Sequence, residues 1–206
     1  MTRRLWGRIS SVNVQKVLWT LAELGIDYDR EDAGFHYGQV DTDAFRALNP
    51  NGRIPVWQEP GLTLWESHAI VRHLVSAHPG VIDHSAVADQ WMEFGTSTLQ
   101  PPFIAVFFQC VRLPMDQRSD AVLAKQSAAL NAALAIVEGH LSGKDWMNNR
   151  ALSTAEIALG APMHRIFDVE GWPRDTYPAI EAWLARLRDR PAYRDHVMTS
   201  YEELRA

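Results

Sequence analysis

The chain has 206 residues, of which 47% are apolar and 22% charged, as expected for a globular protein with one core or two small ones. Its net charge of −5 at pH 7 leaves no excess of basic residues to attract phosphates, which argues against nucleic-acid binding. The single cysteine, Cys110, excludes an intrachain disulfide and a CxxC redox pair, and we expect a reducing, cytoplasmic setting.

The N-terminal stretch MTRRLWGRIS has two arginines but no apolar segment behind them, so we do not expect a secretory signal peptide. No unbroken run approaches the ~18 apolar residues of a membrane-spanning helix. We therefore expect neither a membrane nor a nucleic acid among the partners of this protein.

Short strand-like and helical pieces alternate over residues 1–77. Strands are predicted in RRLWG, in IDYDRED, in NPNGRIPVW and in LTLW, with an irregular segment between the second and the third. Apolar residues at helical spacing predict a helix from Val12 to Leu24, and Gly25 is a natural stop. A second helix is predicted from Ser67 to Ala77. This order predicts an α/β unit of about 75 residues.

The pattern changes after a short linker at residues 78–86. Long periodic runs such as AVADQWMEFGTSTLQ, SDAVLAKQSAALNAALAIVEGHL and AIEAWLARLRDR contain no convincing strand, and the second is rich in strong helix formers. Residues 87–206 are therefore predicted to form an all-helical domain.

The segment LSTAEIALG, in the second half of the chain, has a strong helix-start pattern. Ser153 and Glu156 have the spacing of a capping box, and Leu152 and Ile157 occupy the positions of a hydrophobic staple. This pattern predicts the start of a helix and carries no chemistry of its own.

The run NPNGRIPVW contains a contradiction, because Pro55 removes a ladder N–H from an otherwise strand-forming segment. A cis X–Pro bond costs only ~0.5–1 kcal/mol. We expect a cis Ile54–Pro55 bond that leaves the backbone groups of Ile54 open to a peptide-like ligand.

Several kinds of site are not supported by the sequence. The eight histidines are scattered, without an i,i+4 pair or a cysteine cluster, so no metal site is expected. The glycine-rich nucleotide loops and the G-x-S-x-G elbow are absent. Cys110 lies on an apolar stretch and is read as a small core residue.

Two polar pieces precede the predicted helices of the first half. Ser10, Ser11 and Asn13 stand where the positive end of a helix dipole stabilises an anion, although a plain helix cap explains them equally well. Glu66 and Ser67 begin the second helix, where a hydroxyl and free N–H groups suit a carboxylate and the acid suits an ammonium. Together they suit an amino-acid head group, and a plain cap is again the alternative.

The combination of SSVNVQKV, NPNGRIPV, LWESHAIVRHL and LSTAEIALG, in this order and spacing, resembles the cytosolic glutathione transferases over essentially the whole chain. The S-x-N-V-Q-K-V-L piece is most similar to bacterial and phi-like members that use a serine. The resemblance implies a thioredoxin-like N-terminal domain followed by an all-helical C-terminal domain, usually as a homodimer. It also implies a function, the conjugation of glutathione, bound as a co-substrate without a metal, to small hydrophobic electrophiles.

Carried over to this sequence, the resemblance implies that Ser11 donates a hydrogen bond to the glutathione sulfur. Ser10 and Asn13 are near enough to share or replace this role. A free thiol with a pKa near 8.5 is only about 3% thiolate at pH 7. One hydroxyl hydrogen bond and the helix N-terminus would lower this pKa by about one to two units, at roughly 1.4 kcal/mol per unit.

The remaining glutathione contacts are implied at five positions. Pro55 matches the cis-proline of the family, and Ile54 pairs its backbone with the cysteinyl part of glutathione. Glu66 and Ser67 match the residues that hold the γ-glutamyl end. Arg53 replaces a glutamine common in phi-like members and remains able to reach a glutathione carboxylate.

This sequence departs from the family in two further places. Val40 and Asp41 stand where phi-like members have a basic pair, which leaves open how the glycyl carboxylate is held. Glu156 stands where the family more often has Asp, and we expect the cap to form with either acid.

The electrophile would occupy an apolar pocket beside the sulfur. The expected wall residues are aromatic, although aromatic residues at helical spacing are also common in cores: Phe35, Phe103, Phe107, Phe108 and Trp172. Two other functions stay open. One is glutathione-dependent reduction of disulfides or peroxides, with Asn13 as the alternative thiolate donor. The other is non-catalytic binding of glutathione and hydrophobic ligands.

Overall fold

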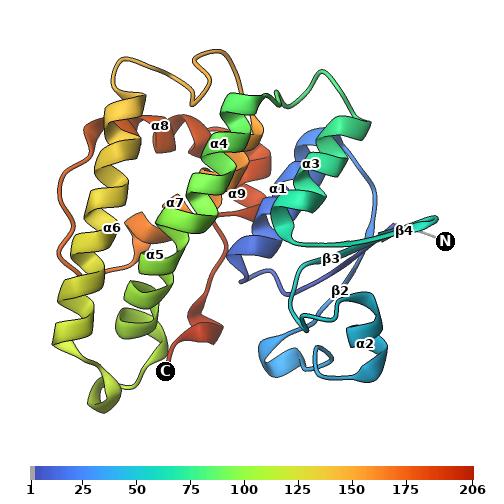
Figure 1. Ribbon diagram of the computed structural model, residues 1–206, viewed down its shortest axis with the longest axis horizontal. Coiled ribbons are helices and arrows are strands. Elements are labelled where there is room, and N and C mark those ends of the chain that lie inside the picture. The colour runs from blue at the N-terminus through green and yellow to red at the C-terminus, as the bar shows by residue number, and fades with distance from the viewer. Residues whose placement is uncertain (1–2) are drawn as a thin grey trace.

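The computed structural model describes residues 3–206, so the first two residues of the predicted N-terminal domain lie outside it. A small sheet with its helices forms one side of the molecule, and a group of longer helices forms the other (Figure 1). The sheet side is built by the N-terminal third of the chain and the helical side by the rest, as the sequence pattern predicts. This is the order of an α/β N-terminal domain and an all-helical C-terminal domain that the resemblance implies.

The sheet has four strands in the order β2-β1-β3-β4. The elements of this side are β1 (Arg4–Trp6), α1 (Val12–Leu24), β2 (Asp29–Glu31), a 3-10 turn (Phe35–Tyr37), α2 (Asp43–Leu48), β3 (Val56–Glu59), β4 (Leu62–Trp65) and α3 (Ser67–Ala77). Strand β1 runs parallel to β2 and antiparallel to β3, with Leu5 opposite Arg30 and Trp57. Leu5 and Trp57 of the sheet share one core with the buried side chains of α1 and α3, whereas Val56 packs with Ala33 and Phe45 in a second, smaller cluster.

The predicted strand in NPNGRIPVW is shorter than expected, because β3 begins only at Val56. Ahead of it, the side chain of Asn49 accepts from the N–H of Asn51 at 3.0 Å and donates to the carbonyl of Arg53 at 2.7 Å. The Ile54–Pro55 peptide bond that follows is cis, as expected. The segment from Asn49 to Pro55 is therefore a side-chain-stabilised turn that leads into the strand.

Helix α2 was not predicted, since that segment was expected to be irregular. It has six residues and buries only Phe45, so it lacks the repeated apolar spacing that reveals a helix in a sequence. Thr42 begins it by accepting the N–H of Phe45 at 3.2 Å.

The helical side consists of α4 (Ala86–Phe94), α5 (Gln100–Phe107), α6 (Asp120–Leu141), α7 (Thr154–Asp168), α8 (Pro178–Arg188) and α9 (Pro191–His196). Two π-helical turns, Gly95–Leu99 and Phe108–Arg112, make the stretch from α4 to Arg112 continuously helical. The first π turn lies immediately before α5, whose second and third residues, Pro101 and Pro102, cannot donate backbone hydrogen bonds. The chain ends in 3-10 turn Glu202–Leu204, and the C-terminal segment runs between the two sides of the molecule (Figure 1).

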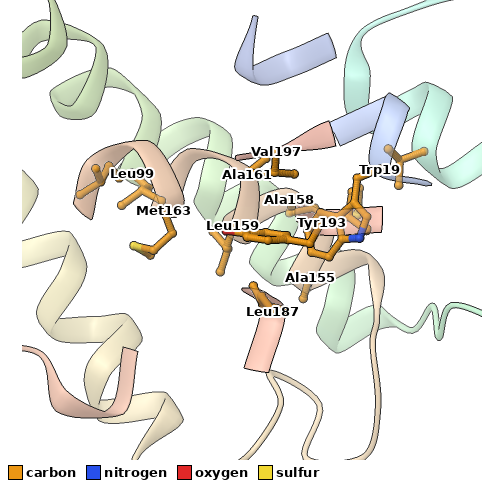
Figure 2. Packing of buried hydrophobic residues seen from close by; sticks show 14 of the residues in the cluster. Trp19, Leu99, Ala155, Ala158, Leu159, Ala161, Met163, Leu187, Tyr193 and Val197 are labelled. Atoms are coloured by element: carbon orange, nitrogen blue, oxygen red, sulfur yellow. The ribbon is translucent and has the colours of Figure 1, made fainter. Parts of the chain in front are cut away.

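The two sides meet in a shared core around Trp19 of α1. Its ring makes an edge-on contact with Tyr193 of α9, at 4.8 Å between ring centroids, and Figure 2 shows the two rings together beside Leu187. The Tyr193 hydroxyl donates to the carbonyl of Gly160 in α7 at 2.8 Å. A Cβ at Gly160 would lie 2.8 Å from Leu187 and 3.1 Å from Trp19, so a glycine is required for this close approach.

The capping box at the start of α7 is formed as predicted. Ser153 accepts at its side chain from the backbone, and Glu156 accepts the backbone N–H of Ser153 at 2.9 Å. Glu156 is fully buried and also accepts the N–H of Met147 at 2.5 Å, so it ties the preceding loop to the helix. Leu152 and Ile157, the staple positions, are both buried in the main core.

Helix α6 is the one helix of the described residues that is long and apolar enough, by length and composition, to span a membrane. An 18-residue window of this helix has a mean hydropathy of 1.2, because alanines and leucines are spread through it without a long unbroken apolar run. In this structure α6 packs against α5 and α8.

Candidate functional site

The connection from β1 to α1 brings the chain sharply to the start of the helix. Gly7 has a φ of 147°, and a Cβ there would lie 2.5 Å from a methyl group of Val14. Only a glycine fits this approach. The residues that follow, Arg8 to Ser11, therefore lie directly over the N-terminal end of α1.

The two adjacent serines have different surroundings. Ser10 is buried, and its hydroxyl donates to the carboxylate of Glu203 in the C-terminal segment. Its carbonyl accepts from the Arg165 guanidinium at 2.9 Å. Ser11 is the N-cap residue of α1, with φ −83° and ψ 119°, and its side chain makes no capping hydrogen bond. The hydroxyl of Ser11 is thus left to interact with a ligand at this helix end.

Asn13 is oriented by a lysine from the next turn of the helix. The Oδ1 of Asn13 accepts from Lys16 Nζ at 3.2 Å, which leaves the amide N–H groups of Asn13 to donate elsewhere. Lys16 is fully enclosed, and burial lowers its pKa to about 7, while Glu66 acts in the opposite direction.

Two hollows open on either side of Asn13. The first hollow, a cavity of about 170 Å³, is lined by Arg8, Ser10, Ser11, Val12, Asn13, Gln100, Phe103, Ile104, Phe107, Phe108, Arg112, Arg165 and Leu204. The second hollow, of about 240 Å³, is lined by Asn13, Lys16, Glu66, Ser67, His68, Ala69, Arg72, Glu93, Thr96 and Gln100. Because Asn13 and Gln100 line both, the two hollows adjoin.

The predicted pair at the start of α3 lies in the second hollow. Ser67 is the first residue of the helix and is buried, whereas Glu66 is exposed. Glu66 has φ 71° and ψ 118°, a conformation that is strained for a residue with a side chain. Strain of this kind is often found at ligand sites, and here it brings a carboxylate next to the free N–H groups of a helix end.

The predicted residues Arg53, Ile54 and Pro55 line neither hollow. Arg53 is exposed, and its carbonyl is engaged by Asn49. Ile54 is half-buried near the β1–α1 connection, where a Cβ at Gly7 would lie 3.4 Å from it.

Three of the five predicted aromatic wall residues line the first hollow: Phe103, Phe107 and Phe108. Phe35 is half exposed at its edge, with the guanidiniums of Arg8 and Arg112 over its ring at 5.7 and 4.9 Å. Trp172 lies elsewhere, since it follows α7, donates to the carbonyl of Val169 and is part of the core. Trp172 is therefore a core residue and not a wall residue of the pocket.

The fold brings to the site several residues that local sequence patterns did not identify. Lys16 lies within the motif SSVNVQKV, and its position one turn after Asn13 was a usable signal. Arg112, Arg165 and Leu204 carry no local signal, because they reach the first hollow only when three distant segments of the helical side pack together.

Cys110 lines neither hollow. It is half-buried against the core, its thiol lies 3.7 Å from the carbonyl of Gly171, and burial raises its pKa. Among residues 3–206 no three His, Cys, Asp or Glu side chains form a group able to hold a metal ion.

Residues 1–76 match the family model described as "Glutathione S-transferase, N-terminal domain", and residues 89–191 match "Glutathione S-transferase, C-terminal domain". The chain is 34% identical over 203 residues to glutathione S-transferase GstB of Escherichia coli, covering 94% of this chain and 97% of the relative. It is 30% identical to glutathione S-transferase 4 of Zea mays, covering 92% and 89%. A crystal structure of a theta class glutathione S-transferase from Xanthomonas axonopodis pv. citri with glutathione bound superposes with a TM-score of 0.92. That protein is 36% identical, and the match covers 97% of this chain and 99% of the other.

Proposed function

Because this chain belongs to the glutathione S-transferase family, we propose that it conjugates the thiolate of glutathione to hydrophobic electrophiles. In this reaction the sulfur attacks an electrophilic carbon of the second substrate, and the thiol proton passes to solvent. The chain would supply a place for glutathione, a donor that favours the thiolate, and a pocket for the electrophile.

The observation that carries this proposal is the free hydroxyl of Ser11. Ser11 stands at the N-terminus of α1, lines the first hollow and makes no capping hydrogen bond, whereas the hydroxyl of Ser10 is bound to Glu203. We therefore assign the sulfur contact to Ser11. Asn13 lies two residues further on with its amide N–H groups unengaged by Lys16, and it is the second donor.

The proposed mechanism depends on lowering the pKa of the glutathione thiol. A hydrogen bond to the thiolate and the positive end of the α1 dipole both favour the charged sulfur. A shift of the thiol pKa by about 1.5 units, which corresponds to ~2 kcal/mol, would make the thiolate a major form at neutral pH. The thiolate rather than the thiol is the nucleophile, so this shift increases the rate of attack.

Glutathione would extend from the second hollow to the edge of the first. Glu66 and Ser67 suit the ammonium and the carboxylate of its γ-glutamyl end. The backbone of Ile54, next to the cis bond, would pair with the cysteinyl part, and Arg53 is the nearest cation of that segment for a carboxylate. The electrophile would then lie in the first hollow against Phe103, Phe107 and Phe108, with Phe35 at its edge.

The test is a comparison of Ser11→Ala, Ser10→Ala and Asn13→Ala with glutathione bound. We expect Ser11→Ala to raise the pKa of the bound thiol, followed by ultraviolet difference absorbance, and to lower turnover with an aryl halide at least about tenfold. Asn13→Ala should have a smaller effect. Ser10→Ala should leave the thiol pKa almost unchanged, because its hydroxyl already has a partner.

The outcomes separate the alternatives. A purified protein that binds glutathione without forming thiolate near neutral pH would be a binding protein, and the proposal would fail. If Asn13→Ala has the largest effect and disulfides are reduced faster than aryl halides are conjugated, the reductase function is the right one.

A homodimer in the cytoplasm is part of the same proposal and rests on the family resemblance. Static light scattering of the purified chain at micromolar concentration is the direct test of the dimer. A mass of 23.3 kDa would identify a monomer and contradict it.

A further inference from the structure

Three arginines surround the first hollow, although a pocket for a purely hydrophobic electrophile has no need of them. Arg8 comes from the β1–α1 connection, Arg112 from the last helical turn after α5, and Arg165 from α7. Their side chains share the hollow with the phenylalanine rings that form its apolar wall. The hollow is therefore apolar on one part of its wall and cationic on another.

The guanidiniums are held mainly by aromatic rings. The Cζ of Arg112 lies 4.9 Å from the ring centroid of Phe35 and 5.0 Å from that of Phe108. The Cζ of Arg165 lies 5.5 Å from the ring of Phe107 and 4.9 Å from that of Tyr201. Stacking of this kind orients a guanidinium without neutralising its charge.

Carboxylates do not balance this charge. Glu203 is the only acid among residues 3–206 that comes within 4.0 Å of the three guanidiniums, at 3.9 Å from the Nε of Arg8, and it also accepts from Ser10. The buried Nε of Arg8 has no hydrogen-bond partner. Asp168, which acts on Arg165 from a longer distance, is hydrogen-bonded to Tyr201.

A guanidinium stays charged in proteins even where burial disfavours its charge. Burial lowers the pKa of Arg165 to about 10, and the neighbouring Arg8 contributes to this shift. Burial also lowers the pKa of Arg8; Glu203 raises it and Arg112 lowers it further. Three positive charges and one negative charge around one small cavity leave an excess that an anionic ligand would balance.

We propose that the first hollow selects electrophiles that carry a carboxylate on an aromatic ring. The ring would pack on the phenylalanines, and the carboxylate would accept hydrogen bonds from the guanidinium of Arg112, with the positive charge of Arg8 nearby. This proposal rests on the proposed conjugation and names the class of its second substrate. The cavity of about 170 Å³ is large enough for one substituted ring, since engineered cavities of about 150 Å³ bind benzene.

A matched pair of aryl chlorides tests the proposal: 4-chloro-3-nitrobenzoate and its methyl ester. With either compound the glutathione sulfur forms a bond to the ring carbon that carries chlorine, the C–Cl bond breaks, and chloride leaves with the electron pair. Each kcat/KM is divided by the uncatalysed rate constant with glutathione, because the ester is intrinsically more reactive. We expect this ratio to favour the acid by about tenfold, the gain from one charged hydrogen bond.

Substitutions of Arg112 test whether its guanidinium causes the preference for the acid over the ester. Arg112→Gln should bring acid and ester to near parity while the KM for glutathione stays unchanged, and Arg112→Lys should restore part of the preference. Arg118→Gln is the matched control, because it removes one positive charge from an exposed residue that donates only to the carbonyl of Leu113. It should leave the ratio unchanged.

Binding is measured as well, by calorimetry with the two conjugation products, one carrying the carboxylate and the other the methyl ester. Equal or weaker binding of the carboxylate product, or an equal loss for both electrophiles in Arg112→Gln, would overturn the proposal. An equal loss for both electrophiles would mean that Arg112 stabilises the glutathione thiolate and not the carboxylate of the second substrate. Absence of turnover with both electrophiles would contradict the proposed conjugation alone, because the binding of the two products still decides the specificity.

Discussion

The Nζ of Lys16 lies 3.1 Å from the Nε2 of His68, in a buried contact between α1 and α3. The Nδ1 of His68 lies 3.2 Å from the hydroxyl of Thr96, which in turn donates to the carbonyl of Met92 in α4. A neutral His68 that accepts at Nε2 and donates at Nδ1 satisfies every group in this chain. Asn13, next to the proposed sulfur position, is thereby connected to the helical side of the molecule.

This contact predicts a pH dependence of stability. Burial lowers the pKa of Lys16 from 10.5 to about 7, so between these values the unfolded chain binds a proton that the folded chain does not. Stability therefore rises with pH across this window, by at most about 1.4 kcal/mol per pH unit. Lys16→Met has no such proton, and the stability of the wild type relative to this variant should increase between pH 7 and pH 10.5.

Urea denaturation of both proteins at several pH values measures this difference, and Lys125→Met, on the exposed face of α6, controls for the loss of a lysine charge. If the free energy of unfolding of the wild type minus that of Lys16→Met is constant or falls with rising pH, the pKa of Lys16 is not lowered in the folded protein.

The contact between Ser10 and Glu203 predicts that the C-terminal segment is anchored by one side chain. In Glu203→Ala the hydroxyl of Ser10 loses its acceptor, and we expect hydrogen exchange of residues 202–206 to become about tenfold faster. Glu202→Ala is the control, because Glu202 pairs only with the exposed Arg205. Equal exchange in both variants would mean that apolar packing and the backbone hydrogen bond from Ala206 to Val111 hold the segment without Glu203.

The hydrogen bonds of Glu156 predict that Glu156→Gln, which removes the charge but keeps the shape of the side chain, destabilises the protein. Its carboxylate accepts from the backbone N–H groups of Met147 and Ser153 and from the Ser153 hydroxyl, and a glutamine amide offers only one acceptor oxygen. Glu156→Gln should therefore lower the free energy of unfolding by about 1–3 kcal/mol. Chemical denaturation measures this loss. Glu181→Gln, in the exposed first turn of α8, should change it by less than about 0.5 kcal/mol.

Two helical glycines predict opposite effects of the same substitution. Gly160→Ala would insert a Cβ 2.8 Å from Leu187 and 3.1 Å from Trp19, and should destabilise the fold by about 1–3 kcal/mol. Gly139→Ala adds a Cβ to open space on α6 and should stabilise it by about 0.5–1 kcal/mol. Thermal unfolding distinguishes the two, and a destabilised Gly139→Ala would contradict the open surroundings of that residue.

Local patterns predicted the elements whose ends are encoded in neighbouring residues. Helix α1 runs from Val12 to Leu24 and stops at Gly25, which has the left-handed conformation expected of a C-terminal glycine. Helix α3 also has its expected ends. Helix α2 escaped prediction because six residues with one buried side chain show no periodicity.

The parts of the candidate site that lie at helix starts were also predictable from neighbouring residues. Ser10, Ser11 and Asn13 share one hollow, and Glu66 and Ser67 share the adjoining one, since both groups lie at helix starts that the sequence marks. The difference between the two serines was not predictable, because it depends on Glu203, which is 193 residues away in the chain. Trp172 was assigned to the pocket from its residue type alone, and packing puts it in the core.

Local sequence patterns are enough to predict the two-part architecture, the helix that begins at the proposed sulfur position and the family to which the chain belongs. These features depend on periodicity, capping and short motifs, which are properties of neighbouring residues. Which serine is free, and what kind of wall faces it, depends instead on contacts between segments that are distant in the chain. Arg8, Arg112 and Arg165 come from three segments that meet only through packing of the two sides, and no local pattern can encode such a meeting.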